Sequence, residues 1–115
     1  MNLDEAITKH AEWKVKFRSA MAKKERLDAS AIGMDTRCDL GKWLAGEGRR
    51  LYGAKTNFAQ LVALHAEFHK AAGKVAALIN AEKYEQAETM LGGSAEYALA
   101  SSNVVTAITR LKKEI

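Results

Sequence analysis

Residues 56–80 read TNFAQLVALHAEFHKAAGKVAALIN, and this stretch decides the fold. Its apolar residues recur at intervals of three and four, which is the spacing of one face of an α-helix. The residues of this face are Phe58, Leu61, Val62, His65, Phe68, His69, Ala72, Val75 and Ile79. The spacing predicts a long helix over residues 56–80 with two histidines on its buried face.

Two flanking segments repeat the helical spacing. In residues 3–27 it places His10 on the apolar face of a first long helix. In residues 82–113 the apolar stripe keeps its phase across Gly92 and Gly93, and we therefore predict one continuous helix despite these glycines. This last stripe consists of Tyr84, Ala87, Leu91, Ala95, Ala98, Val105, Ile108 and Leu111.

The segment between the first two long helices predicts a loop followed by a short helix. Ser30, Gly33 and Asp35 favour a loop over residues 28–36. Asp35 or Thr36 is suited to cap a short helix over residues 37–45, with Cys38 in its first turn. Beyond it, residues 46–55 predict an irregular connection with one turn around residues 49–52.

The composition supports an all-helical chain. There is no proline among the 115 residues, and Ala, Lys, Glu and Leu are abundant while aromatic residues are few. A chain of this length is expected to form one domain, residues 1–115. The fold class is therefore all-α, as a four-helix bundle of three long helices plus a short helix that carries Cys38.

Several classes of protein are disfavoured by the sequence. A single cysteine cannot form an internal disulfide, and no signal-peptide core is visible, so we expect a cytoplasmic protein. No apolar run approaches the length of a membrane span, so no membrane insertion is expected. The net charge of +4 is modest and acids are interleaved with the bases, so no nucleic-acid partner is expected. The bases of the first helix are Lys14, Lys16, Arg18, Lys23, Lys24 and Arg26.

The chain's three histidines and its one cysteine have the pattern of a zinc site. His65 and His69 are four residues apart and share a helix face, and His10 lies on the apolar face of another helix. Packing does not explain three buried imidazoles, whose polar atoms need partners, whereas a shared metal does. We predict that His10, Cys38, His65 and His69 bind one Zn²⁺, because one thiolate and three imidazoles suit tetrahedral zinc.

A catalytic metal site is disfavoured. In HAEFH, Glu67 is the third residue and points away from the metal-binding face, unlike the general base of zinc proteases. Four protein ligands also leave no position for an activated water, and the core lacks the carboxylates of a di-iron bundle. We therefore expect no enzymatic activity. A purely structural zinc-stabilised interaction module is the alternative to a sensor.

Three motifs carry a family resemblance: His10-Ala-Glu-Trp13, the run CDLGKW of residues 38–43, and HAEFH of residues 65–69. Together they resemble the chemoreceptor zinc-binding (CZB) domain. The resemblance implies a helical bundle with one zinc per protomer, and a bacterial cytoplasmic role in chemotaxis or cyclic-di-GMP signalling. It also implies a homodimer that works with a chemoreceptor or a diguanylate cyclase and senses zinc or oxidants such as hypochlorous acid. No receptor or cyclase domain is recognisable, and we therefore expect a stand-alone member.

Roles within the predicted site follow from residue type. Cys38 is expected to be both ligand and redox switch, because a thiolate at a helix start is reactive. Leu40 and two tryptophans, Trp13 and Trp43, are expected to form a supporting shell. Gly41 is expected where another helix approaches closely. The sequence leaves open whether Asp39, Glu12 or Asp35 orients an imidazole.

Overall fold

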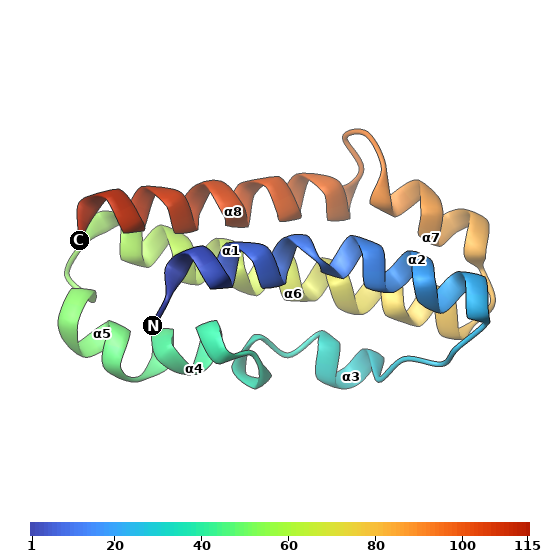
Figure 1. Ribbon diagram of the computed structural model, residues 1–115, viewed down its shortest axis with the longest axis horizontal. Helices are drawn as coiled ribbons and strands as arrows, with labels where there is room; N and C mark the ends of the chain where they lie inside the picture. Colours follow the sequence, from blue (N-terminus) through green and yellow to red (C-terminus); the bar gives the residue numbers. More distant parts are fainter.

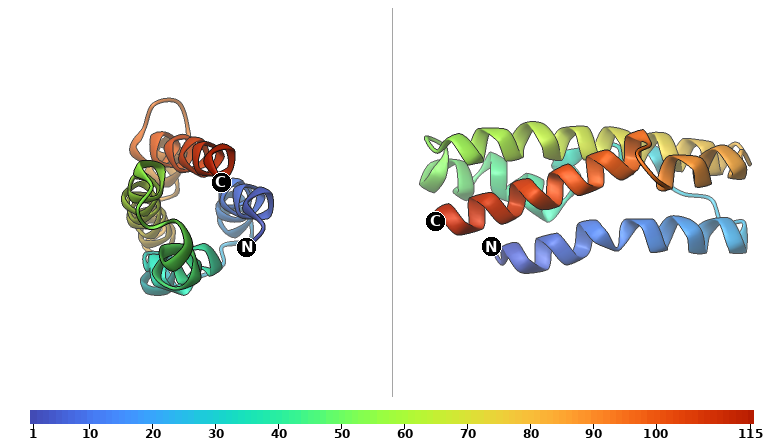
Figure 2. Two further views of the ribbon diagram at one scale, coloured as in Figure 1. Left: turned by 90° about the vertical axis from the view of Figure 1, so that its left-hand side faces the viewer. Right: turned by 90° about the horizontal axis from the view of Figure 1, so that it is seen from above.

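The computed structural model describes residues 1–115, and its nine helical segments form four columns around one core. The end-on view shows the columns clearly (Figure 2), and the chain has no strand. An all-α four-helix bundle is therefore confirmed. The first column is α1 (Leu3–Ala11) and α2 (Trp13–Lys23), and the second is α3 (Ala29–Ile32), the 3-10 helix η1 (Asp35–Arg37), α4 (Asp39–Ala45) and α5 (Glu47–Tyr52). The third is α6 (Thr56–Asn80), and the fourth is α7 (Tyr84–Leu91) with α8 (Glu96–Glu114).

The long helix α6 organises the core. It has the bounds that its sequence predicts and packs most extensively against α8. Its buried face combines aliphatic and aromatic side chains with two histidines, because the three-four spacing turns all of them to the same side. The buried residues of α6 are Phe58, Leu61, His65, Phe68, His69, Ala71, Ala72, Val75, Ala76 and Ile79.

The prediction of one continuous helix over residues 82–113 is wrong. Helix α7 ends at Leu91, Gly92 is extended and Gly93 has a φ of 61°. The chain leaves the bundle as a protruding loop and re-enters it with α8 (Figure 1). The buried face of α8 differs from the predicted stripe only in part. Ile108 and Leu111 are buried as predicted, whereas Ala98 and Val105 are half-buried. The buried residues of α8 are Tyr97, Val104, Ala107, Ile108 and Leu111.

The first helical column is shorter than predicted. It is interrupted at Glu12 and ends at Lys23, whereas the sequence predicts a helix to Leu27. Lys24 adopts a left-handed conformation with φ of 55°, which closes the helix end by hydrogen bonds back to the last turn. The backbone of Leu27 is then bound by the side-chain amide of Asn80, with distances of 2.8 and 2.7 Å.

The segment that carries Cys38 is here called the strap and comprises residues 28–46. It contains two short helical turns, α3 and η1, where the sequence predicts only a loop. Helix α4 begins at Asp39, so its N-cap is Cys38 itself and neither Asp35 nor Thr36. The strap therefore presents the cysteine at the start of a helix that begins two residues later than predicted, so that Cys38 precedes the first turn.

Candidate metal centre

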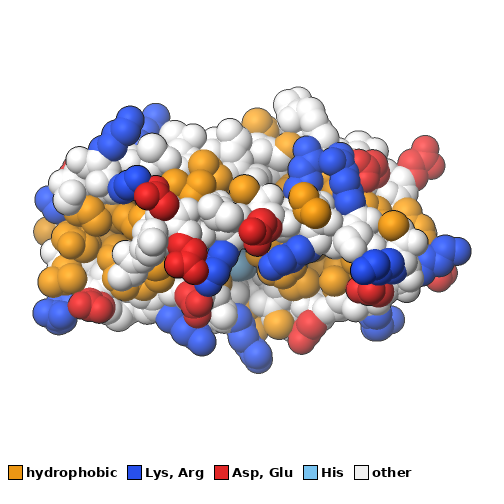
Figure 3. Space-filling model, viewed as in Figure 1, with side chains coloured by type: hydrophobic (Ala, Val, Ile, Leu, Met, Phe, Trp, Pro, Cys, Tyr) orange, Lys and Arg blue, Asp and Glu red, His pale blue; other side chains and the backbone are white.

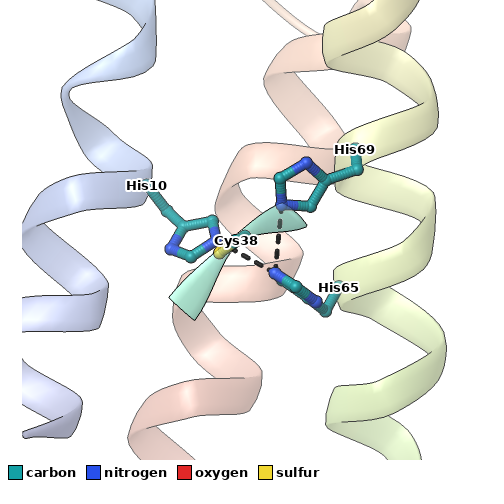
Figure 4. Close-up of side chains that lie close together, drawn as sticks. All are labelled: His10, Cys38, His65 and His69. Carbon is teal, nitrogen blue, oxygen red and sulfur yellow. Dashed lines mark hydrogen bonds between the residues drawn. The ribbon is translucent and has the colours of Figure 1, made fainter. Parts of the chain in front are cut away.

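The structure brings His10, Cys38, His65 and His69 together in the middle of the bundle. Their ligand atoms all lie within 4.8 Å of one another, and the side chains converge on one point (Figure 4). The Nε2 atom of His65 lies 3.1 Å from Nε2 of His10 and 3.1 Å from Nε2 of His69. Sγ of Cys38 lies 3.6 Å from Nε2 of His10. These separations are close to the edges, about 3.4 Å, of a tetrahedron of nitrogens around zinc.

Three elements supply the four side chains. His10 comes from the last turn of α1, His65 and His69 from consecutive turns of α6, and Cys38 from the strap. The imidazoles are 2%, 0% and 4% exposed for His10, His65 and His69, whereas Cys38 is only partly buried. The centre therefore has a buried imidazole side and a more accessible sulfur.

Backbone carbonyl groups orient two of the imidazoles. Nδ1 of His10 lies 2.7 Å from the carbonyl oxygen of Ala6, and Nδ1 of His69 lies 2.8 Å from that of Ile32. An Nδ1–H that donates to each carbonyl leaves the Nε2 lone pair facing the centre, which is the tautomer that binds a metal. The sequence leaves open whether an acidic side chain orients an imidazole, and these two imidazoles are oriented by backbone carbonyls instead of by Asp39, Glu12 or Asp35. Nδ1 of His65 is buried without a hydrogen-bond partner.

The protonation of the site favours metal binding. Burial, followed by the charges of His69 and His10, lowers the pKa of His65 to about 3. Burial also lowers the pKa of His10, although the hydrogen bond to Ala6 acts in the opposite direction. Partial burial raises the pKa of Cys38, but the nearby His69 and the N–H groups of Gly41 and Leu40 outweigh it, so the net pKa is lowered. Neutral imidazoles and a thiolate are the ligand forms that zinc requires.

The residues around the centre explain its close packing. Gly41 is buried, and a Cβ atom there would overlap the carbonyl oxygen of Asp35 and lie 3.3 Å from Cε1 of His65. The close neighbour is thus the backbone of the strap, where the sequence suggests another helix. Leu40 is 1% exposed beside Cys38. Trp13 lines the accessible side of the centre, and Trp43 packs against Tyr52 and Phe58.

Sequence reasoning missed one aromatic neighbour and both carbonyl partners. The ring of Phe68 lies edge-on to His10 and His69, with centroid distances of 5.1 and 5.3 Å. Its place inside the HAEFH motif is a signal that could have identified it. The carbonyls of Ala6 and Ile32 leave no such signal, because any residue type supplies a backbone oxygen.

The residues of this site lie within a match to a known protein family. The family described as "Chemoreceptor zinc-binding domain" matches residues 10–76, a range that begins at His10 and includes the other three residues of the cluster. The chain belongs to this family. A search of curated proteins and a search of solved structures found no match. This chemoreceptor zinc-binding domain is a zinc-binding signalling domain, and its family is one of signalling rather than catalysis.

The donor set of this chemoreceptor zinc-binding domain suits one zinc ion per chain. Two imidazoles are held in the required tautomer, and the four ligand atoms lie within 4.8 Å of one another, close enough to share one ion. When bound, the ion would be coordinated by side chains from α1, α6 and the strap, and would connect these three elements. A separate finding concerns membranes: none of the helices is both long and apolar enough to cross one.

Proposed function

We propose that this protein is a non-catalytic bacterial sensor of the cytoplasm, in which zinc binding reports zinc availability or exposure to an oxidant such as hypochlorous acid. One observation carries the proposal: Cys38 is the only partly exposed member of a cluster whose three imidazoles are buried. The accessible ligand is thus the one that can be oxidised, and it lies on the strap rather than on a long helix.

The chemistry of Cys38 supports a switching role. Its lowered pKa favours the thiolate, which is the form that reacts with oxidants. Transfer of the oxygen atom of hypochlorous acid to the thiolate sulfur gives a sulfenic acid and releases chloride. The sulfenic acid is a weaker metal ligand than the thiolate, and zinc affinity falls as a result. The strap then loses its connection to the histidines through Cys38 and zinc, and keeps the hydrogen bond from His69 to the carbonyl oxygen of Ile32.

The signal is proposed to pass to a partner through a homodimer. The description of the family favours a chemoreceptor as the kind of partner, and a diguanylate cyclase is the alternative. Exposed apolar side chains offer contact points, with Val15, Leu51 and Leu99 exposed by 69%, 49% and 50%. Sedimentation analysis of the zinc-loaded chain tests the dimer, and a monomer at all concentrations would contradict it.

Metal analysis tests the zinc site itself. The purified protein is expected to contain one zinc per chain, and Cys38→Ala and His65→Ala are expected to lose zinc or bind it more weakly. Glu67→Ala is the control, because Glu67 is exposed on the same helix between the two histidines. Equal zinc content in all four proteins would contradict the assignment.

An oxidant titration separates a sensor from a structural zinc module. The structural alternative has support because the four residues connect three separate elements. A sensor releases zinc on addition of hypochlorous acid and keeps most of its helical circular dichroism, and Cys38→Ser releases less zinc at the same dose. A structural module loses its helical signal together with the metal. If Cys38→Ser responds like the parent protein, the cysteine is not the switch.

A further inference from the structure

A groove of about 610 Å³ opens onto the accessible side of the metal centre. One wall is formed by α1 and the start of α2, and the other by residues 31–39 of the strap. His10, Cys38 and His69 line the groove, whereas His65 does not. In the space-filling view a histidine is visible at the bottom of a hollow between acidic and basic side chains (Figure 3). The groove therefore leads from solvent to one face of the centre.

The charged side chains of this groove balance, and bound zinc makes its net charge positive. Six charged side chains line it, three acids and three bases. One base, Lys9, lies 3.6 Å from both Glu5 and Asp39, and the charges of these three side chains sum to −1. The other three are Glu12, Lys16 and Arg37, whose charges sum to +1, and neither of these two bases is in an ion pair. Zinc with three imidazoles and one thiolate would add a net charge of about +1.

The groove also has an apolar lining. The ring of Trp13 lies along it with the Lys16 amine 4.7 Å from the ring centroid, and Met34 is 47% exposed at the opposite wall. The other apolar residues of the lining are Met1, Ala6, Ala31, Ile32 and Leu40. A volume of this size and a lining that combines apolar side chains with a few charges are typical of small-molecule sites.

We propose that this groove binds a small organic anion with an apolar body. The anionic group lies beside Arg37 and the face formed by His10, Cys38 and His69, and the hydrocarbon part packs between Trp13 and Met34. The inference rests on the proposed function, because bound zinc supplies the net positive charge of the groove. An occupant covers the sulfur of Cys38, and so makes the response of the switch depend on a metabolite-sized carboxylate.

Hexanoate is a suitable probe, with hexylammonium and hexanol as comparators of equal length. Calorimetry with the zinc-loaded full chain is expected to give a millimolar Kd for hexanoate, as ligand efficiency allows for eight non-hydrogen atoms. The comparators are expected to bind at least several-fold more weakly. In a Trp43→Phe background, hexanoate is also expected to change the fluorescence of Trp13, which lines the groove.

Two variants test the position of the ligand. Arg37→Gln is expected to weaken hexanoate binding about tenfold, because a charged hydrogen bond is lost. Arg110→Gln is the matched control, since Arg110 is an exposed arginine on α8 outside the groove, and it is expected to change nothing. Ala31→Trp fills the groove and is expected to abolish binding while zinc content stays at one per chain.

The outcomes distinguish this inference from the proposed function. Zinc-loaded protein that fails to bind hexanoate, or that binds hexylammonium equally well, overturns the groove site and leaves the zinc sensor intact. Equal affinity in Arg37→Gln and the parent protein overturns it as well. An apparent Kd that rises with protein concentration assigns the groove to a second copy of the chain. Protein that contains no zinc contradicts the proposed function and, with it, this inference.

Discussion

The Nδ1–H of His69 donates a hydrogen bond of 2.8 Å to the carbonyl oxygen of Ile32, and so connects the metal centre to the strap. Cys38 makes a second connection six residues further along. One ligand, Cys38, is thus part of the strap, and another, His69 of α6, is hydrogen-bonded to the backbone of the strap. The order of the strap is therefore expected to depend on the metal.

Removal of zinc is expected to loosen the strap and spare the long helices. In hydrogen exchange, amides of residues 29–46 are expected to exchange faster after chelation, because the connections through Cys38 and His69 weaken together. Amides of α6 and α8 are expected to stay protected, since these helices pack against each other through the apolar core. Equal loss of protection throughout the chain would instead identify the metal as a structural element of the whole fold.

Gly41→Ala is expected to disturb the metal centre. An added Cβ overlaps the carbonyl oxygen of Asp35, so the strap must move, and overpacking of this kind costs about 1–3 kcal/mol. Because the displaced backbone adjoins His65 and Cys38, zinc affinity is expected to fall about tenfold or more. Competition with a chromophoric chelator measures the affinity, and denaturant unfolding measures the stability.

Gly92→Ala is the matched control for that substitution. A Cβ atom at Gly92 would meet only the carbonyl oxygen of Glu88 at 3.9 Å, and the φ of −111° suits any residue. Its zinc affinity is expected to equal that of the parent protein. If the two alanine variants bind zinc equally well, the close approach at Gly41 is not what shapes the site.

Asn80→Ala is expected to lower stability without removing zinc. The amide of Asn80 donates to and accepts from the backbone of Leu27, and its loss leaves a partly buried N–H without a partner, while the C=O keeps only the N–H of Ala29. The expected cost is about 2 kcal/mol in the free energy of unfolding, measured with urea on the metal-free chain. Asn103→Ala on the exposed side of α8 is expected to change it little. A similar loss in both variants would show that the pairing with Leu27 contributes nothing specific.

The sequence predicts the long helices better than their connections. The bounds of α6 follow directly from its spacing, since ten of its residues are buried on one face and no competing signal interrupts it. The sequence predicts one helix after Asn80 where the chain has two. The apolar stripe misleads here because Ala95 and Ala98 are small residues that fit a buried or a half-buried position equally well. The break depends on the extended Gly92 and on the φ of 61° at Gly93, and sequence spacing does not carry that information.

The sequence predicts which residues supply the donor atoms of the metal centre, but not which groups orient them. Histidine and cysteine have few roles in a buried helical core, so their positions alone indicate a shared metal. Their orientation depends on carbonyl groups of Ala6 and Ile32, which leave no mark in residue type. The groove beside Arg37 likewise arises from the separation of α1 and the strap, which is a property of the folded chain.

Acid is expected to destabilise the metal-free protein through its histidines. The pKa of His65 falls from an ordinary 6.5 to about 3 on folding, and that of His10 is also lowered, in both cases mainly by burial. Below pH 6.5 the unfolded chain therefore binds protons that the folded chain does not. The contribution of His65 to the free energy of unfolding is fully present above pH 6.5 and is lost as the pH falls toward 3, with a slope of about 1.4 kcal/mol per pH unit. The contribution of His10 has the same sign.

Urea unfolding of the chelated protein between pH 7.5 and pH 4 measures this slope. In His65→Leu the unfolded chain has one histidine fewer to protonate, so its slope over the same range is expected to be smaller by about one proton. The acids of the chain also titrate toward the lower end of the range, but they are common to both proteins and cancel in the difference. Identical slopes would mean that the folded chain protonates His65 as readily as the unfolded chain does, which its complete burial opposes.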